Sequence, residues 1–171
     1  MSLQVNSPAP NLQLPDLESN LHALIQPDRT VTILNFWSAD CPVCERVDNV
    51  LLPRLTTWGK RVILIAIAPN ANESDHLIRE VAHQRGIPLV LLDRQLKATT
   101  LYNAQTTPEF FVVDQAGILR YHGALDDVSF RRQTPNRFYL FEAVEALLNG
   151  QLPPISQTSP YGCAIVRYST A

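Results

Sequence analysis

The sequence lacks the features that mark several large protein classes. Only three of its 171 residues are cysteine, which excludes a secreted scaffold held together by many disulfides. The net charge of −2 and the isoelectric point near 6.0 give no bias toward nucleic acid or an anionic membrane surface, so neither partner is expected. The longest apolar run, Val62 to Ala68, is far too short to cross a bilayer, and we expect no membrane insertion.

The first ten residues, MSLQVNSPAP, have neither a basic start nor an apolar centre, so no signal peptide is predicted. We therefore expect a cytoplasmic protein if the chain is complete. A periplasmic or membrane-tethered protein is expected instead if a signal or an anchor has been removed. The length is that of one domain of ordinary size with a sizeable core.

The stretch from Val31 to Pro53 organises the rest of the chain. Its apolar start, Val31 to Trp37, predicts a strand buried on both faces. A helix is predicted from Pro42 onward, since proline suits the first helical position. This places Cys41 at the N-cap, with the backbone N–H of Cys44 within reach of its sulfur. The apolar side chains of the helix recur at steps of three and four: Val43, Val47, Val50, Leu51, Leu55 and Trp58.

Two cysteines at CxxC spacing on a helix N-terminus indicate redox chemistry. Cys41 is predicted to be the nucleophile, because the helix end favours a thiolate and lowers its pKa below the usual value of about 8.5. Cys44 is predicted to be more buried and to attack the mixed disulfide that Cys41 forms. A zinc site would need four ligands, and there is no second CxxC and no compact histidine spacing. No metal and no cofactor are expected.

The remaining chain predicts alternating strands and helices, followed by an antiparallel hairpin and a last helix. Asn20 to Ile25 is expected to form one helical turn, and the last helix to begin at Thr134-Pro135. Helix caps are expected at Asn72 or Ser74, at Gly86 and at Asp93. The predicted strands are Leu12–Leu14, Val31–Trp37, Arg61–Ala68, Leu89–Leu92, Glu109–Asp114 and Gly117–His122.

Phe36 to Cys44 resembles the F-W-x-x-x-C-x-x-C segment of the thioredoxin superfamily, and Ala9 to Asp16 resembles the opening of its redoxin branch. The resemblance implies an α/β fold: a thioredoxin-like three-layer sandwich whose mixed sheet has a parallel βαβ half and an antiparallel ββα half. It divides the chain into an N-terminal lead-in (1–30), a thioredoxin-like domain (31–150) and a C-terminal tail that packs on the body (151–171).

The same resemblance implies the surroundings of the cysteines. Thr107-Pro108 matches the Thr-Pro whose proline is cis and faces the cysteines, and its backbone would offer strand-like hydrogen bonds to a substrate. Trp37 matches a tryptophan that covers the site, although a core position is the alternative. These three residues are candidate substrate-binding residues.

Three further residues are predicted from their positions beside the motif. Pro42 and Val43, between the cysteines, complete the candidate substrate-binding set and are implied to tune the redox potential. Glu109, directly after Pro108, is a candidate for proton transfer, with a solvated carboxylate at the strand end as the alternative.

Cys163 lies in a tail segment, GCAIVR, that resembles the Gly-Cys-x-Ile-Lys ending of peroxiredoxin-like CxxC proteins. Cysteine behaves as a small hydrophobe, and this one stands in an apolar run. We therefore expect Cys163 to pack against the body without a redox role. A third-thiol relay, or a cross-link to a partner, is the alternative.

These observations predict a thiol:disulfide oxidoreductase that cycles a Cys41–Cys44 dithiol and disulfide. Its partners would be protein or small-molecule disulfides and a thiol electron donor. A thiol peroxidase is an alternative, because Ser38 to Cys41 loosely matches the [T/S]-x-x-C of peroxiredoxins. A non-catalytic interaction module with the same fold is another.

Overall fold

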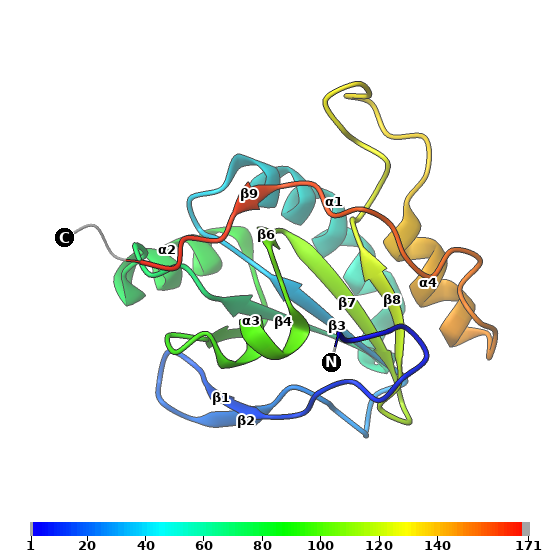
Figure 1. Cartoon of the computed structure of the whole chain (residues 1–171), viewed down its shortest axis with the longest axis horizontal. Coiled ribbons are helices and arrows are strands. Elements are labelled where there is room, and N and C mark those ends of the chain that lie inside the picture. The colour runs from blue at the N-terminus through cyan, green and yellow to red at the C-terminus, as the bar shows by residue number, and fades with distance from the viewer. Residues whose placement is uncertain (1, 169–171) are drawn as a thin grey trace.

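The fold is built around a mixed five-stranded sheet with the order β5-β4-β3-β7-β8 in the computed structural model, which describes residues 2–168 (Figure 1). β3 runs parallel to β4, and β4 runs parallel to β5. β7 runs antiparallel to both β3 and β8. These relations confirm the predicted thioredoxin-like sheet. The five strands are β3 (Val31–Phe36), β4 (Val62–Ala68), β5 (Val90–Leu92), β7 (Glu109–Asp114) and β8 (Leu119–Gly123).

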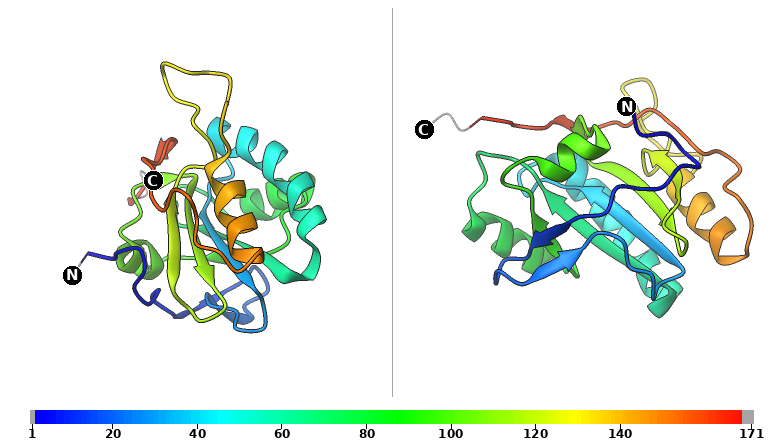
Figure 2. Two further views of the ribbon diagram at one scale, coloured as in Figure 1. Left: turned by 90° about the vertical axis from the view of Figure 1, so that its right-hand side faces the viewer. Right: turned by 60° about the horizontal axis from the view of Figure 1, so that its bottom comes forward.

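Helices cover both faces of the sheet, which gives three layers (Figure 2). Two of them, α1 and α4, pack on one face around Val47, Leu51 and Val144. The opposite face packs against α3 and the lead-in through Leu24, Tyr102 and Phe111. In the part of the chain described, no helix is long and apolar enough to cross a membrane. The helices are α1 (Pro42–Trp58), α2 (Asp75–Arg85), α3 (Lys97–Tyr102) and α4 (Tyr139–Leu148), with a short 3-10 turn η1 (Gly59–Arg61) after α1.

The lead-in is a small hairpin in which β1 (Gln13–Pro15) pairs antiparallel with β2 (Leu21–Ala23). The predicted strand is therefore confirmed, but the predicted helical turn at Asn20 to Ile25 is wrong. The Asp16 carboxylate accepts the backbone N–H groups of Glu18 and Asn20, which closes a tight turn. That turn sends the chain back along β1, where cross-strand bonds replace helical ones.

The last helix begins at Tyr139 and not at Thr134-Pro135. The reason is a competing acceptor in the preceding loop, since the Asp127 carboxylate accepts the backbone N–H groups of Asn136 and Arg137. These groups are held in the loop, which projects from the body in Figure 1. Because the N–H groups of Asn136 and Arg137 are bonded to Asp127, the helix begins after these two residues.

The predicted caps of α2 are confirmed, whereas the N-cap residue of α3 is Leu96 and not the predicted Asp93. Of the two candidates for α2, the residue at the N-cap is Ser74, whose hydroxyl accepts the N–H of Leu77 at 3.1 Å. Gly86 ends this helix in the left-handed region with φ 77°. The buried carboxylate of Asp93 accepts the N–H groups of Ala98 and Thr99 at the start of α3.

A buried ion pair ties α1 to the end of α2 and to the chain just after β3. Asp48 of α1 is 1% exposed, and its Oδ2 accepts from Arg85 at 3.0 Å and from the indole N–H of Trp37 at 2.8 Å. Arg85 also donates to the carbonyl of Ala39 at 3.1 Å. Burial raises the pKa of the Asp48 carboxyl, and the bonds from Trp37 and Arg85 oppose that rise. The carboxylate therefore depends on both donors.

We expect Arg85→Met to lower the free energy of unfolding by about 3 kcal/mol at neutral pH, because it leaves the Asp48 carboxylate buried without its cation. The loss should shrink as the pH falls, since a protonated carboxyl needs no cation. Denaturant titrations at several pH values measure both effects.

Arg79→Met on the same helix is the matched control. Arg79 is half exposed, its contact to Glu18 is 3.7 Å, and its one close hydrogen bond, to the carbonyl of Leu17 at 2.9 Å, is exposed, so this variant should change stability by no more than about 1 kcal/mol. Equal losses in the two variants would contradict the assignment of a structural ion pair to Arg85.

Candidate active site

Cys41 lies where the chain leaves β3 and enters α1. Its backbone is extended, with φ −111° and ψ 119°, and it is the N-cap of the helix that begins at Pro42, as predicted. The predicted contact between the Cys44 N–H and the Cys41 sulfur is not formed, and no side-chain bond caps this helix. The sulfur of Cys41 is instead bonded to another cysteine.

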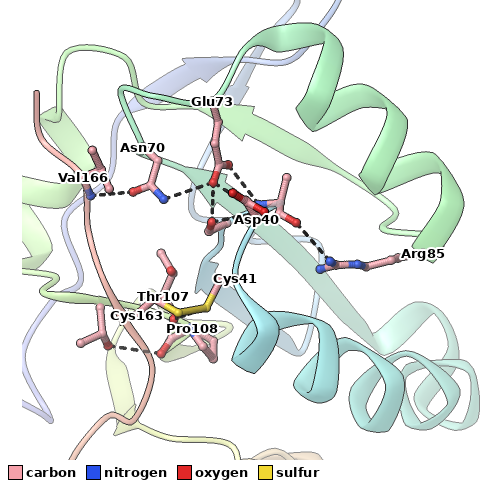
Figure 3. The surroundings of a disulfide bond; sticks show 12 residues. Asp40, Cys41, Asn70, Glu73, Arg85, Thr107, Pro108, Cys163 and Val166 are labelled. Atoms are coloured by element: carbon pink, nitrogen blue, oxygen red, sulfur yellow. Dashed lines mark hydrogen bonds between the residues drawn. A yellow bond between two sulfur atoms is a disulfide. The ribbon is translucent and has the colours of Figure 1, made fainter. Parts of the chain in front are cut away.

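That cysteine is Cys163, so the expectation that it only packs against the body is wrong. Two short strands, β6 (Thr106–Thr107) and β9 (Cys163–Ala164), pair antiparallel and place Cys163 opposite Thr107. Because the carbonyl oxygen of Thr107 lies 3.3 Å from the Cys41 sulfur, this pairing brings the two cysteines together. The two Cα atoms of the disulfide are 6.4 Å apart. Figure 3 shows the disulfide next to Thr107 and Pro108.

The Thr107-Pro108 peptide bond is cis, as the resemblance implied. It faces Cys41, and the Thr107 side chain is fully buried. In the disulfide, Cys41 has no proton to donate to the Thr107 carbonyl. Once reduced to a thiol, it could donate a weak hydrogen bond across the same 3.3 Å.

Cys44 is the remaining thiol, and it is fully buried in the same cluster of packed side chains as Cys41. Burial, and to a smaller extent the nearby charge of Asp48, raises the pKa of the Cys44 thiol to about 12. The Ser38 N–H and the Thr107 hydroxyl act in the opposite direction but do not offset burial. Cys44 is therefore protonated near neutral pH.

Asp48 is a site residue that the sequence analysis missed. It lies four residues after Cys44 and therefore on the same face of α1, one turn farther along. Its Oδ2 is bonded to Trp37 and Arg85, whereas its buried Oδ1 has no hydrogen-bond partner. One signal could have revealed it, namely an acidic residue within an otherwise apolar stripe.

Glu73 was missed as well, and it holds the loop that leads to Cys41. Its carboxylate is 4% exposed and accepts from the Ser38 hydroxyl and from the backbone N–H groups of Ala39 (3.0 Å) and Asp40 (3.4 Å). The side chain of Asn70 donates to it as well, at 3.3 Å. Figure 3 shows these bonds converging on Glu73. No local sequence pattern predicts this role, because Glu73 follows β4 and is more than 30 residues from the loop that it binds.

Trp37 is completely buried and donates to Asp48, so it lies beneath the cysteines in this state. Pro42 is exposed and Val43 is half-buried, so both lie at the surface beside Cys41. The contact of all three with a substrate stays a prediction.

Glu109 is buried, and the alternative of a solvated carboxylate is wrong. It accepts the backbone N–H groups of Gln105 (3.1 Å) and Thr106 (3.3 Å), and its other oxygen lies 3.1 Å from His122 Nε2. These bonds hold the chain that enters β6. A role of Glu109 in proton transfer stays a prediction.

Comparisons with known proteins place this site in a redox context. The sequence is 28% identical over 120 residues to the thiol-disulfide oxidoreductase ResA of Geobacillus kaustophilus, covering 68% of this chain and 67% of ResA. It is also 28% identical over 119 residues to the thiol:disulfide interchange protein DsbE of Allochromatium vinosum, covering 68% of this chain and 65% of DsbE.

Solved structures match the whole fold. A hypothetical protein from Sinorhizobium meliloti superposes with a TM-score of 0.85 at 25% identity, covering all of this chain and 98% of that one. An uncharacterized conserved protein from Geobacillus kaustophilus gives 0.86 at 26% identity, covering 98% of this chain and 94% of that one. The family model described as AhpC/TSA matches residues 5–122. Because this match spans more than half of the sequence, the chain belongs to the AhpC/TSA family.

Proposed function

We propose that this chain is a thiol:disulfide oxidoreductase in which Cys41 is the nucleophile. The Cys41–Cys163 disulfide carries the proposal, because it shows Cys41 bonded to a sulfur that arrives on a strand beside Thr107. The relatives named ResA and DsbE support the same class of activity.

The position of Cys41 favours the thiolate once the disulfide is reduced. The free N–H groups of the first turn of α1 and the helix dipole stabilise a negative charge at the N-cap. Glu73 fixes the preceding loop through Ala39 and Asp40, so Cys41 is held at this helix end. A thiolate that is stabilised and fixed in position in this way is suited to exchange with disulfides.

The proposed reaction begins with attack of the Cys41 thiolate on a protein or small-molecule disulfide. One substrate sulfur becomes bonded to Cys41, and the other leaves as a thiolate. A second thiol of the chain then attacks Cys41 and releases the first substrate sulfur. The substrate is reduced by two electrons and the chain is oxidised, so a thiol donor must reduce the chain before the next cycle.

Cys44 is proposed as this second thiol. Cys163 reaches Cys41 along the edge of β6, and a substrate strand bonded to Cys41 at that edge would exclude it. Cys44 lies within α1 and does not compete for this edge. Its proton must be removed first, and the unpaired Oδ1 of Asp48 one helical turn away supports Asp48 as the acceptor.

The surroundings of Cys41 favour disulfide exchange over the two alternative functions. In a thiol peroxidase of the [T/S]-x-x-C type, the hydroxyl of Ser38 would serve the cysteine, whereas here it donates to Glu73. In a non-catalytic module Cys41 would be unreactive, whereas here it has formed a disulfide.

Cysteine variants test the assignment of roles. Cys41→Ser should abolish the reduction of insulin disulfides, because no other thiol lies at the helix N-cap. Cys44→Ser should lose turnover and accumulate Cys41 in disulfides, either with substrate or with Cys163, which peptide mapping by mass spectrometry identifies. Cys163→Ser should keep turnover and is the matched cysteine control. Turnover retained in Cys44→Ser but lost in Cys163→Ser would reassign the resolving role to Cys163.

The pH dependence of stability tests the protonated state of Cys44. Its pKa rises on folding from 9.0 to about 12, so its contribution to stability is complete below 9.0 and is lost as the pH rises toward 12. For fully reduced protein, the stability advantage of wild type over Cys44→Ala should therefore fall by about 1.4 kcal/mol per pH unit above 9.

Denaturant unfolding between about pH 7 and about pH 10.5 measures this slope. Val47→Ala, a buried and non-titrating change on the same helix, should show a deficit that does not depend on pH. A Cys44→Ala difference that is equally flat would show that the Cys44 thiol is not held protonated.

A further inference from the structure

The C-terminal tail forms a continuous strand-like attachment along β6. Figure 1 shows this segment crossing the body, with β9 next to β6. Thr106 pairs with Ala164, Thr107 pairs with Cys163, and the N–H of Ile165 donates to the carbonyl of Gln105 at 3.2 Å. The tail therefore occupies the edge that leads directly to the cis proline.

Beyond Ile165, the tail is bonded to the loop after β4, which contains Asn70, Ala71 and Glu73. The N–H of Val166 donates to Asn70 Oδ1 at 2.8 Å, and the carbonyl of Val166 accepts the N–H of Ala71 at 2.9 Å. Asn70 in turn donates to Glu73, which holds the loop preceding Cys41 (Figure 3). One short segment is thus bound at the disulfide through Cys163 and again three residues later through Val166.

The side chains of the tail meet different surroundings at successive positions. A Cβ added to Gly162 would overlap the carbonyl oxygen of Thr107, so only glycine fits without a shift of the backbone. Ala164 is exposed, whereas Ile165 is 8% exposed and packs into the core cluster of the lead-in face. The edge of β6 therefore suits a four-residue strand with glycine first, cysteine second, any residue third and an aliphatic residue fourth.

We propose that this edge is the binding site for an extended, cysteine-bearing strand of the form Gly-Cys-x-aliphatic, and that Gly162–Ile165 is its resident occupant. The inference rests on the proposed function, because it identifies the substrate class of the Cys41 site. A protein disulfide with this pattern binds in the register of the tail, and the tail must leave β6 before that substrate can bind.

Release of the tail needs no external oxidant or reductant. Cys44 gives up its proton and its sulfur attacks the sulfur of Cys41, so that a Cys41–Cys44 bond forms as the Cys41–Cys163 bond breaks. Cys163 leaves as a thiolate and takes up the proton that Cys44 lost. The chain keeps the same number of electrons, and only the partner of Cys41 changes. The thiol donor of the proposed function then reduces the Cys41–Cys44 disulfide, and the Cys41 thiolate is available to the substrate.

Short peptides test the binding rule on the full chain carrying Cys44→Ser and Cys163→Ser, in which Cys41 is the reactive thiol. The probe is Tyr-Gly-Cys-Ala-Ile-Val with its cysteine as a mixed disulfide with thionitrobenzoate, whose release is followed by absorbance. Replacing its glycine by alanine should slow release about tenfold, because the added methyl meets the backbone carbonyl of Thr107. Replacing its isoleucine by aspartate should slow release to a similar degree.

The matched control peptide carries serine at the exposed alanine position, and it should react at the rate of the parent. Equal rates for all four peptides, together with a Cys41 that reacts with 5,5′-dithiobis(2-nitrobenzoic acid) itself, would overturn the binding rule and leave the proposed function standing. A Cys41 that reacts with neither the peptides nor the free reagent would overturn both.

A second experiment tests the resident tail in the otherwise unchanged chain. Gly162→Ala should lower the fraction of Cys41–Cys163 disulfide formed in a glutathione redox buffer and speed alkylation of Cys41 about tenfold, since the added methyl displaces the strand. Ala164→Ser, at the exposed position of the same strand, should behave as wild type. An unchanged disulfide fraction in Gly162→Ala would show that the tail does not depend on this edge.

Discussion

The register of β3 between its two neighbours is the constraint on which the active site depends. Phe36 at the end of β3 pairs with Ile67 of the parallel strand β4 and with Glu109 of the antiparallel strand β7. The chain that leaves β3 toward Cys41 therefore meets the chain that enters β7 through Pro108. Because a shift by one residue would turn every side chain of β3 to the opposite face, the buried faces of the sheet hold this meeting point in place.

The two CxxC cysteines differ because one lies at the end of the helix and the other lies within it. Cys41 stands where unpaired N–H groups favour a negative charge. Cys44, one turn later, is enclosed by side chains that raise its pKa to about 12. This asymmetry orders the proposed reaction, since a thiolate is available at Cys41 first and Cys44 must lose a proton before it can attack.

Local patterns were sufficient for the individual strands of the sheet, the CxxC helix and most caps, because each is determined by nearby residues, whereas the family resemblance supplied the arrangement of the strands. The failures came where a distant or competing partner decides the structure. The Asp16 turn replaced a predicted helical turn with β2, and Asp127 delayed the start of α4. Cys163 was misassigned because its partner depends on the pairing of two-residue strands, β6 and β9, which are separated by most of the C-terminal half and carry too few residues to give a pattern.

Asp48 and Glu73 were missed for a related reason, and the positioning role of Glu109 was not predicted either. Asp48, Glu73 and Glu109 are all buried, and each carboxylate accepts hydrogen bonds from, or contacts, groups in other parts of the chain, although Asp48 Oδ1 has no partner. Burying a carboxylate is costly unless such partners are supplied, so three in one region indicate that the backbone around the cysteines is held by charge-assisted bonds. Glu73 holds the loop before Cys41, and Glu109 holds the chain that enters β6. Separate carboxylates thus position Cys41 and the β6 edge on which Cys163 lies. The tail contacts both regions, since it pairs with Thr107 of β6 and donates to Asn70, which is bonded to Glu73. A change of partner at Cys41 can therefore release the tail without disturbing the two supports.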